Sequence, residues 1–100
     1  MEKRSPHYDL ATVQADVARM GAAAFTKTAL DGGRAMGLTT AEMLAVIAAL
    51  ARRNFYKSMT TYTDAHVWQD VYHALTPGRK DAYIKITLRD RAPVIQFKEK

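Results

Sequence analysis

The sequence Tyr83-Ile84-Lys85-Ile86-Thr87-Leu88-Arg89 decides the fold. Apolar and polar side chains alternate through it, and Ala82 extends the pattern by one residue on the apolar side. A period of two is typical of a β-strand with one face in the core and the other in water. Because parallel strands are usually apolar on both faces, this strand predicts an antiparallel sheet with one open face.

Three other stretches have the composition of strands. The range Tyr56–Tyr62 is rich in aromatic and β-branched residues, and Trp68–Leu75 stops at the turn sequence of residues 76–78. Pro93 leads into a last strand, Val94–Lys98, which again separates apolar from polar side chains. Together with Tyr83–Arg89 they predict a sheet of four strands.

The residues before the strands have helical spacing. Asp9 has the position of an N-cap, and apolar side chains then recur on one helical face as far as Gly21. A second helix is predicted from about Thr26 to Gly37, although its glycine pair, residues 32 and 33, costs about 1 kcal/mol per residue relative to alanine.

The third helix has the clearest signals. Thr39 and Glu42 have the spacing of a capping box, and an apolar stripe continues to Leu50. This helix, with its neighbours, can cover one face of the sheet and leave the other face polar, basic and open. The prediction is an α+β fold in a single domain (residues 1–100), with a helical half at about 9–51 and a sheet half at about 55–100.

The net positive charge comes from the sheet half, because the five Lys/Arg of residues 1–51 are balanced by five Asp/Glu. Residues 52–100 carry ten Lys/Arg against five Asp/Glu, hence the whole net charge of +5, and seven of the nine aromatic residues. Cations beside aromatic rings are typical of a nucleic-acid surface, although an ordinary basic surface beside a tyrosine-rich sheet has the same composition. Trp68 is interpreted as a core anchor, whereas three tyrosines could serve either purpose: Tyr56, Tyr62 and Tyr72.

The amino-acid composition also indicates the cellular compartment in which the protein is expected. The chain has no cysteine, which excludes a disulfide framework, a thiolate zinc site and a cysteine nucleophile, and fits a reducing cytoplasm. No apolar signal-peptide core follows the charged first residues. The longest apolar stretch, Ala41–Ala51, is too short to span a bilayer. A soluble cytoplasmic protein without a membrane partner is expected.

The open face suits RNA hydrolysis, because RNA supplies its own nucleophile, the 2′-hydroxyl. The protein must accept a proton, stabilise a pentacoordinate phosphorane and protonate the leaving 5′-oxygen. The reference pKa of tyrosine is about 10, and a cation cluster would lower it, while mutual repulsion would lower the pKa values of the lysines. Taken singly, each candidate is more often a solvated surface group. The candidates are Lys57, Gln69, Tyr83, Lys85, Arg89 and Lys98.

Other chemistries have less support. A two-metal nuclease needs clustered carboxylates, whereas the acidic residues of the sheet half are isolated and expected near turns or strand ends: Asp64, Asp70, Asp81 and Asp90. Asp64-Ala65-His66 and His73 lack a zinc-site spacing, and Asp31-Gly32-Gly33 lacks the strand that precedes a phosphate-binding loop. Neither a metal nor another cofactor is expected.

Five blocks of the sequence carry a resemblance to a known family: Met1-Glu2-Lys3-Arg4-Ser5-Pro6-His7, Phe55-Tyr56-Lys57-Ser58-Met59-Thr60-Thr61-Tyr62, Trp68-Gln69-Asp70-Val71-Tyr72, Tyr83-Ile84-Lys85-Ile86-Thr87 and Phe97-Lys98-Glu99-Lys100. These blocks resemble the MqsR family, motility and quorum-sensing regulator toxins. They follow in family order and cover the whole chain, while the helical half is similar in pattern more than in identity.

The resemblance implies a RelE-like fold and sequence-selective cleavage of mRNA, at GC-containing triplets in one member. It implies no cofactor, and neutralisation by a cognate MqsA-type antitoxin, a zinc-binding protein with a DNA-binding domain. Operator DNA would then be reached only through the antitoxin, in repression of the pair's own operon. The family's activity-linked residues fall on Lys57, Gln69, Tyr83 and Lys98, with Met59 nearby; Tyr56, Lys85 and Arg89 are further candidates for substrate binding.

The resemblance also suggests roles. Lys57 and Lys98 would bind the scissile phosphate, Tyr83 would exchange a proton with the 2′-hydroxyl or the leaving oxygen, and Gln69 would hold the substrate. One departure is a histidine that the family can carry after the Tyr83 strand, where this chain reads Leu88-Arg89-Asp90-Arg91. Any role of that histidine is lost here or passes to one of the arginines.

Two other classes of function stay open. A non-catalytic nucleic-acid-binding regulator would use the same basic face for phosphate contacts alone. A pure interaction module would offer an exposed edge strand to a partner, which a toxin must also do for its antitoxin. RNA incubated with the protein in EDTA separates an enzyme from a regulator.

Overall fold

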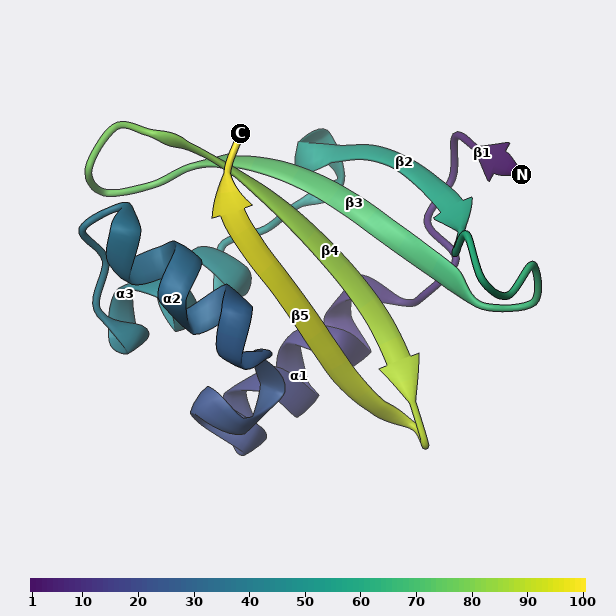
Figure 1. The fold of residues 1–100 in the computed structure, drawn as a ribbon, viewed down its shortest axis with the longest axis horizontal. Helices are drawn as coiled ribbons and strands as arrows, with labels where there is room; N and C mark the ends of the chain where they lie inside the picture. Colours follow the sequence, from purple (N-terminus) through teal and green to yellow (C-terminus); the bar gives the residue numbers. More distant parts are fainter.

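A five-stranded antiparallel sheet organises the chain (Figure 1). The computed structural model describes residues 1–100. The strands lie in the order of the sequence, each hydrogen-bonded to the next: β1 (Glu2–Lys3), β2 (Phe55–Thr60), β3 (Trp68–Leu75), β4 (Asp81–Arg89) and β5 (Ala92–Glu99). With three helices beside it, the sheet confirms the predicted α+β fold.

The four predicted strands are confirmed, β3 with the predicted bounds and the other three with shifted ends. The strand predicted at Tyr56–Tyr62 ends at Thr60, which pairs with Trp68, because the chain must turn back between these two residues. Tyr62 lies fully exposed in that turn. Pro93 lies inside β5 rather than before it. A proline is tolerated there because β5 bonds to another strand, β4, on one side only.

The first strand has no counterpart in the prediction. Glu2 pairs with Met59 and Lys3 with Ser58, so that the first residues of the chain form one edge of the sheet. Two residues are too few for a periodic pattern to show, and a strand this short is identified only by its pairing.

All three predicted helices are confirmed: α1 (Leu10–Met20), α2 (Lys27–Ala35) and α3 (Thr40–Ala48), with short 3₁₀ turns at Gly21–Ala24 and Arg52–Asn54. The side chain of Asp9 caps α1 by accepting from the backbone N–H of Thr12 at 3.0 Å. Thr39 and Glu42 form the capping box of α3. No helix has both the length and the apolar character needed to cross a membrane.

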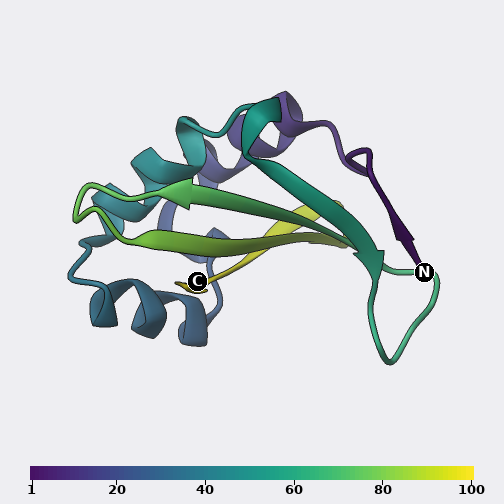
Figure 2. The ribbon, with the colours of Figure 1, turned by 90° about the horizontal axis from the view of Figure 1, so that it is seen from above.

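The glycine pair of α2 allows this helix to lie against the β5 edge. A Cβ on Gly32 would collide with the backbone carbonyl of Phe97, and one on Gly33 would collide with the side chain of Met43. The backbone N–H of Thr26 also donates to the carbonyl of Ile95 at 3.1 Å. Figure 1 shows α2 beside β5, and in the view of Figure 2 the C-terminal end of the chain lies between α2 and α1. The two glycines lower the helix propensity of α2, but only residues without a Cβ allow this close packing.

The two faces of the sheet differ as the alternation predicts. One face joins the helices in a core of 18 buried residues, which includes Tyr72, Ile84, Ile86, Ile95 and Phe97. Leu88 is half-buried and packs against this core. The other face carries the lysines of β2, β4 and β5.

Asp70 and Trp68 differ from their interpretations. Asp70 lies inside β3 and is only 1% exposed, not near a strand end. Its carboxylate accepts hydrogen bonds from the backbone N–H groups of His7 and Tyr8 and from the hydroxyl of Ser58. Trp68 is half-buried outside the core cluster, because the chain's first residues cover it: its ring stacks on His7. These two residues therefore fasten the N-terminal segment to the sheet.

Candidate active site on the open face of the sheet

Tyr83 lies at the centre of a row of polar side chains across three strands. Its Cα pairs with His73 of β3 on one side and with Lys98 of β5 on the other. The ammonium of Lys98 lies 5.5 Å from the centre of the phenol ring, and that of Lys85 lies 5.9 Å from it. Neither ammonium has a carboxylate within 4.0 Å. Two cations without acidic partners thus flank one phenol.

Lys57 joins the same face from β2. It pairs with Val71, which pairs in turn with Lys85. Two strand spacings of about 4.8 Å place the backbones of the two lysines about 10 Å apart, a gap that two lysine side chains can close from either side. Lys57, Tyr83 and Lys98 therefore occupy one surface of the sheet.

An ion pair holds Lys57 in the charged form. Its ammonium donates to the Glu2 carboxylate at 2.7 Å. This hydrogen bond raises the pKa of Lys57 and lowers the pKa of Glu2. The expectation that repulsion lowers the pKa of the lysines is therefore wrong for Lys57, because the unpredicted strand β1 supplies an acid. Lys57 is suited to binding an anion rather than to accepting a proton.

His73, which the sequence indicates only as a possible metal ligand, is a member of the row. Its ring stacks on Tyr56 with 4.5 Å between centroids, and lies 5.4 Å from the ring of Tyr83. Its Nε2 atom is buried without a hydrogen-bond partner. Burial, and next the charge of Lys100, lower the pKa of His73. The strand period could have indicated it, since His73 is four residues from Gln69 and so shares its face.

The other predicted residues lie further from Tyr83. Gln69 pairs with Met59, and its separation of four positions from His73 corresponds to about 13 Å along β3. Arg89 is exposed at the far end of β4, about 20 Å from Tyr83 along the strand. The structure thus brings together Tyr83, Lys85 and Lys98, with Lys57 and Tyr56 beside them, and leaves Gln69, Met59 and Arg89 apart.

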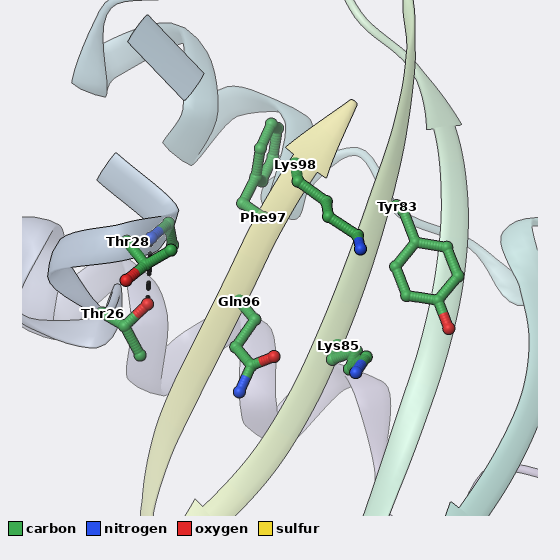
Figure 3. Close-up of a pocket in the computed structure, with 8 residues that line it drawn as sticks. Thr26, Thr28, Tyr83, Lys85, Gln96, Phe97 and Lys98 are labelled. Carbon is green, nitrogen blue, oxygen red and sulfur yellow. Dashed lines mark hydrogen bonds between the residues drawn. The ribbon is translucent and has the colours of Figure 1, made fainter. Parts of the chain in front are cut away.

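A cavity of about 370 Å³ adjoins the row on the β5 side. Lys85 and Lys98 line it together with Gln96 and with Thr26 and Thr28 of the first turn of α2. Figure 3 shows these side chains around the open space, with Tyr83 at its border.

No three acidic or histidine side chains are grouped so that they could hold a metal ion. Asp64 and His66 contact each other at 3.4 Å in the exposed loop after β2, away from His73 on β3. The charge on the open face is instead supplied by lysines.

A phenol between unpaired lysines, on an antiparallel sheet with helices behind it, is an arrangement that can bind a phosphate-bearing ligand. Comparison with known sequences gives the family. The family described as "Motility quorum-sensing regulator, toxin of MqsA" matches residues 5–99. The mRNA interferase toxin MqsR of Escherichia coli (strain K12) is 42% identical over 101 residues, a match that covers all of both chains. The chain belongs to the MqsR toxin family.

Proposed function

We propose that this chain is the toxin of a toxin–antitoxin pair and an endoribonuclease that cleaves mRNA without a metal ion. Two findings support the proposal: membership of the MqsR toxin family, and a relative named as an mRNA interferase. The observation that carries it is the position of Tyr83, whose ring has two unpaired ammonium groups within 6 Å.

The chemistry follows from these positions. Lys98, with Lys57 on the opposite side, binds the scissile phosphate and stabilises the added negative charge of the phosphorane. The 2′-oxygen loses its proton and attacks phosphorus, and the bond to the 5′-oxygen breaks as that oxygen gains a proton. Tyr83 exchanges a proton with one of these two oxygens, and a solvent water molecule exchanges the proton of the other. The products are a 2′,3′-cyclic phosphate and a 5′-hydroxyl, and no external nucleophile is consumed.

Gln69 and Met59 act on a neighbouring part of the RNA. Gln69 lies about 13 Å along β3 from the Tyr83 row, on the side of Lys57, whose β3 partner Val71 is two residues from Gln69. It holds an adjacent nucleotide, and Tyr56, which is 47% exposed, offers a ring for stacking a base. Arg89, further along β4, contributes to the positive surface along which the strand extends.

The finer properties of the family are part of the proposal. Cleavage is at GC-containing triplets, and an MqsA-type antitoxin neutralises the toxin and carries it to operator DNA, where the pair represses its own operon. The mapping of 5′ ends after induction in cells tests the triplet, and copurification with the antitoxin tests the partner.

Purified protein incubated with RNA in EDTA tests the activity. We expect fragments ending in a 2′,3′-cyclic phosphate, and a loss of cleavage of at least about 100-fold in the double variant Lys57→Ala, Tyr83→Phe. A matched control is the variant Lys80→Ala, Tyr62→Phe, which removes a lysine and a phenol from exposed turns. Full cleavage by the first variant contradicts the assigned roles.

Intact but bound RNA would point to the non-catalytic regulator. Both an enzyme and a regulator lose affinity as salt rises, so binding alone does not separate them. RNA that stays unbroken with the unmodified protein, in EDTA and in magnesium, favours the regulator and contradicts the endoribonuclease.

A further inference from the structure

The cavity beside Tyr83 has the size and position of a binding pocket. Its volume of about 370 Å³ lies within the range of about 300–1,000 Å³ typical of small-molecule sites. One wall is the first turn of α2 and the other is the open face of β4 and β5 (Figure 3). It is continuous with the proposed active site, because Tyr83 and Lys98 belong to both.

Two neutral polar side chains face each other across this space. Gln96 rises from β5 and Thr28 from α2 (Figure 3), and both line the cavity. Neither side chain has a hydrogen-bond partner within the protein, whereas Thr26 beside them accepts from the backbone N–H of Ala29 at 3.0 Å. An amide and a hydroxyl each offer both a donor and an acceptor.

This chemistry suits a nucleobase better than a second phosphate. The cations are gathered on the Tyr83 side of the cavity, at Lys85 and Lys98, and the far wall is neutral. Proteins that select single-stranded RNA place an unstacked base against an aromatic ring and bond its edge with amides and hydroxyls. Gln96 is two residues from Lys98 along β5, about 7 Å, so a base in the pocket lies next to a phosphate held by Lys98.

We propose that this cavity receives one base adjacent to the scissile phosphate, and that Gln96 and Thr28 determine which base is accepted. The inference rests on the proposed function, since it assigns a specificity pocket to the same active site. Close packing of α2 on β5 at Gly32 fixes the width of the pocket. The ring of Tyr83 borders the space and stacks on the base.

Cleavage of an RNA oligonucleotide library with random sequence tests the assignment. In Gln96→Ala and Thr28→Ala, we expect the preference for the best base at one position flanking the cut to fall by at least about 5-fold, the effect of losing hydrogen bonds to a base edge. Preferences at the other positions stay unchanged. Thr63→Ala, an exposed threonine in the loop after β2, is the matched control.

An abasic nucleotide at that flanking position gives a second readout. It removes the group that Gln96 contacts, so the unmodified protein and Gln96→Ala cleave the abasic RNA at equal rates. If both variants keep the base preference of the unmodified protein at every position, the inference is wrong while the endoribonuclease stands.

Binding of an uncleavable trinucleotide, with 2′-O-methyl groups, tests the pocket without catalysis. We expect NMR shifts at the side-chain amide of Gln96 and the methyl group of Thr28, and affinities that depend on one base. If the protein cleaves no RNA but shows these shifts, the proposed function fails and the pocket stands. Shifts confined to the lysines, with equal affinities for all bases, overturn the pocket.

Discussion

Replacing Asp70 by asparagine tests the contact that fastens the N-terminal segment to the sheet. The carboxylate accepts from the backbone N–H groups of His7 and Tyr8 at 2.9–3.0 Å and from the hydroxyl of Ser58 at 2.6 Å. In Asp70→Asn the amide group can donate to the Ser58 oxygen, which leaves one neutral oxygen for both backbone N–H groups. A hydrogen bond to a charged group contributes about 1.5–3 kcal/mol.

We therefore expect Asp70→Asn to lower the free energy of unfolding by about 2 kcal/mol. For a domain of this size the melting temperature would fall by about 8–16 °C. Urea unfolding followed by the fluorescence of Trp68, the single tryptophan, measures the change. This residue reports directly on the segment, because its ring stacks on His7 at 5.3 Å.

The control is Asp81→Asn, which neutralises an exposed carboxylate at the start of β4. Exposed substitutions of this kind change stability by less than about 0.5 kcal/mol. If Asp70→Asn also stays within that limit, the buried carboxylate does not hold the segment and the reasoning is refuted.

Three further predictions concern the site and its support. Burial lowers the pKa of His73, so the unfolded chain binds a proton at this imidazole more readily than the folded chain does. The free energy of unfolding, measured with urea, should therefore fall as the pH drops below about 6.5, and it should fall less in His73→Phe. Glu2→Gln frees Lys57 from a competing carboxylate, and binding of uncleavable RNA should tighten by up to about 5-fold. Gly32→Ala forces α2 away from β5, and urea unfolding should show a loss of about 1–3 kcal/mol.

Each of these has a control or a contrary outcome. Gly78→Ala adds a Cβ that meets only an ordinary contact at 3.8 Å, so it should leave stability unchanged. Glu99→Gln removes an exposed acid that pairs with no lysine, and RNA binding should change less than in Glu2→Gln. Equal pH dependence of the unmodified protein and His73→Phe would mean that His73 titrates normally.

The sequence predicts the three helices and the strands β2 to β5 well, because each of them carries a local signal, whereas the two-residue strand β1 carries none. The alternation around Ile84 and Ile86 identifies both the strand and its buried face, and Thr39 with Glu42 marks the start of α3. The helix with the weakest sequence signal, α2, does form, and the reason is its tertiary packing rather than its local helix propensity. Gly32 and Gly33 oppose a helix on their own and are required by what the helix packs against.

The site was only partly predictable, because its remaining members depend on pairing between distant segments. Period two places Tyr83, Lys85 and Lys98 on one face, which the structure confirms. No local pattern shows that Glu2 reaches Lys57, or that Asp70 is buried to bind the backbone of residues 7 and 8. His73 follows the strand period, but the burial of its Nε2 atom without a hydrogen-bond partner appears only once Tyr56 and Tyr83 lie around it.

The strand order also bears on how the molecule assembles. Consecutive strands from β2 to β5 pair as hairpins, which close over short chain distances and form early. The pairing of Glu2 with Met59 spans 57 residues and the bridge of Phe25 to Ile95 spans 70, so both carry a larger loop-closure entropy. The first of these contacts places Glu2 beside Lys57, and the second places α2 beside Gln96. Where the hairpins form before these long-range contacts, the phenol and its lysines are in place before the proposed base pocket gains its helix wall.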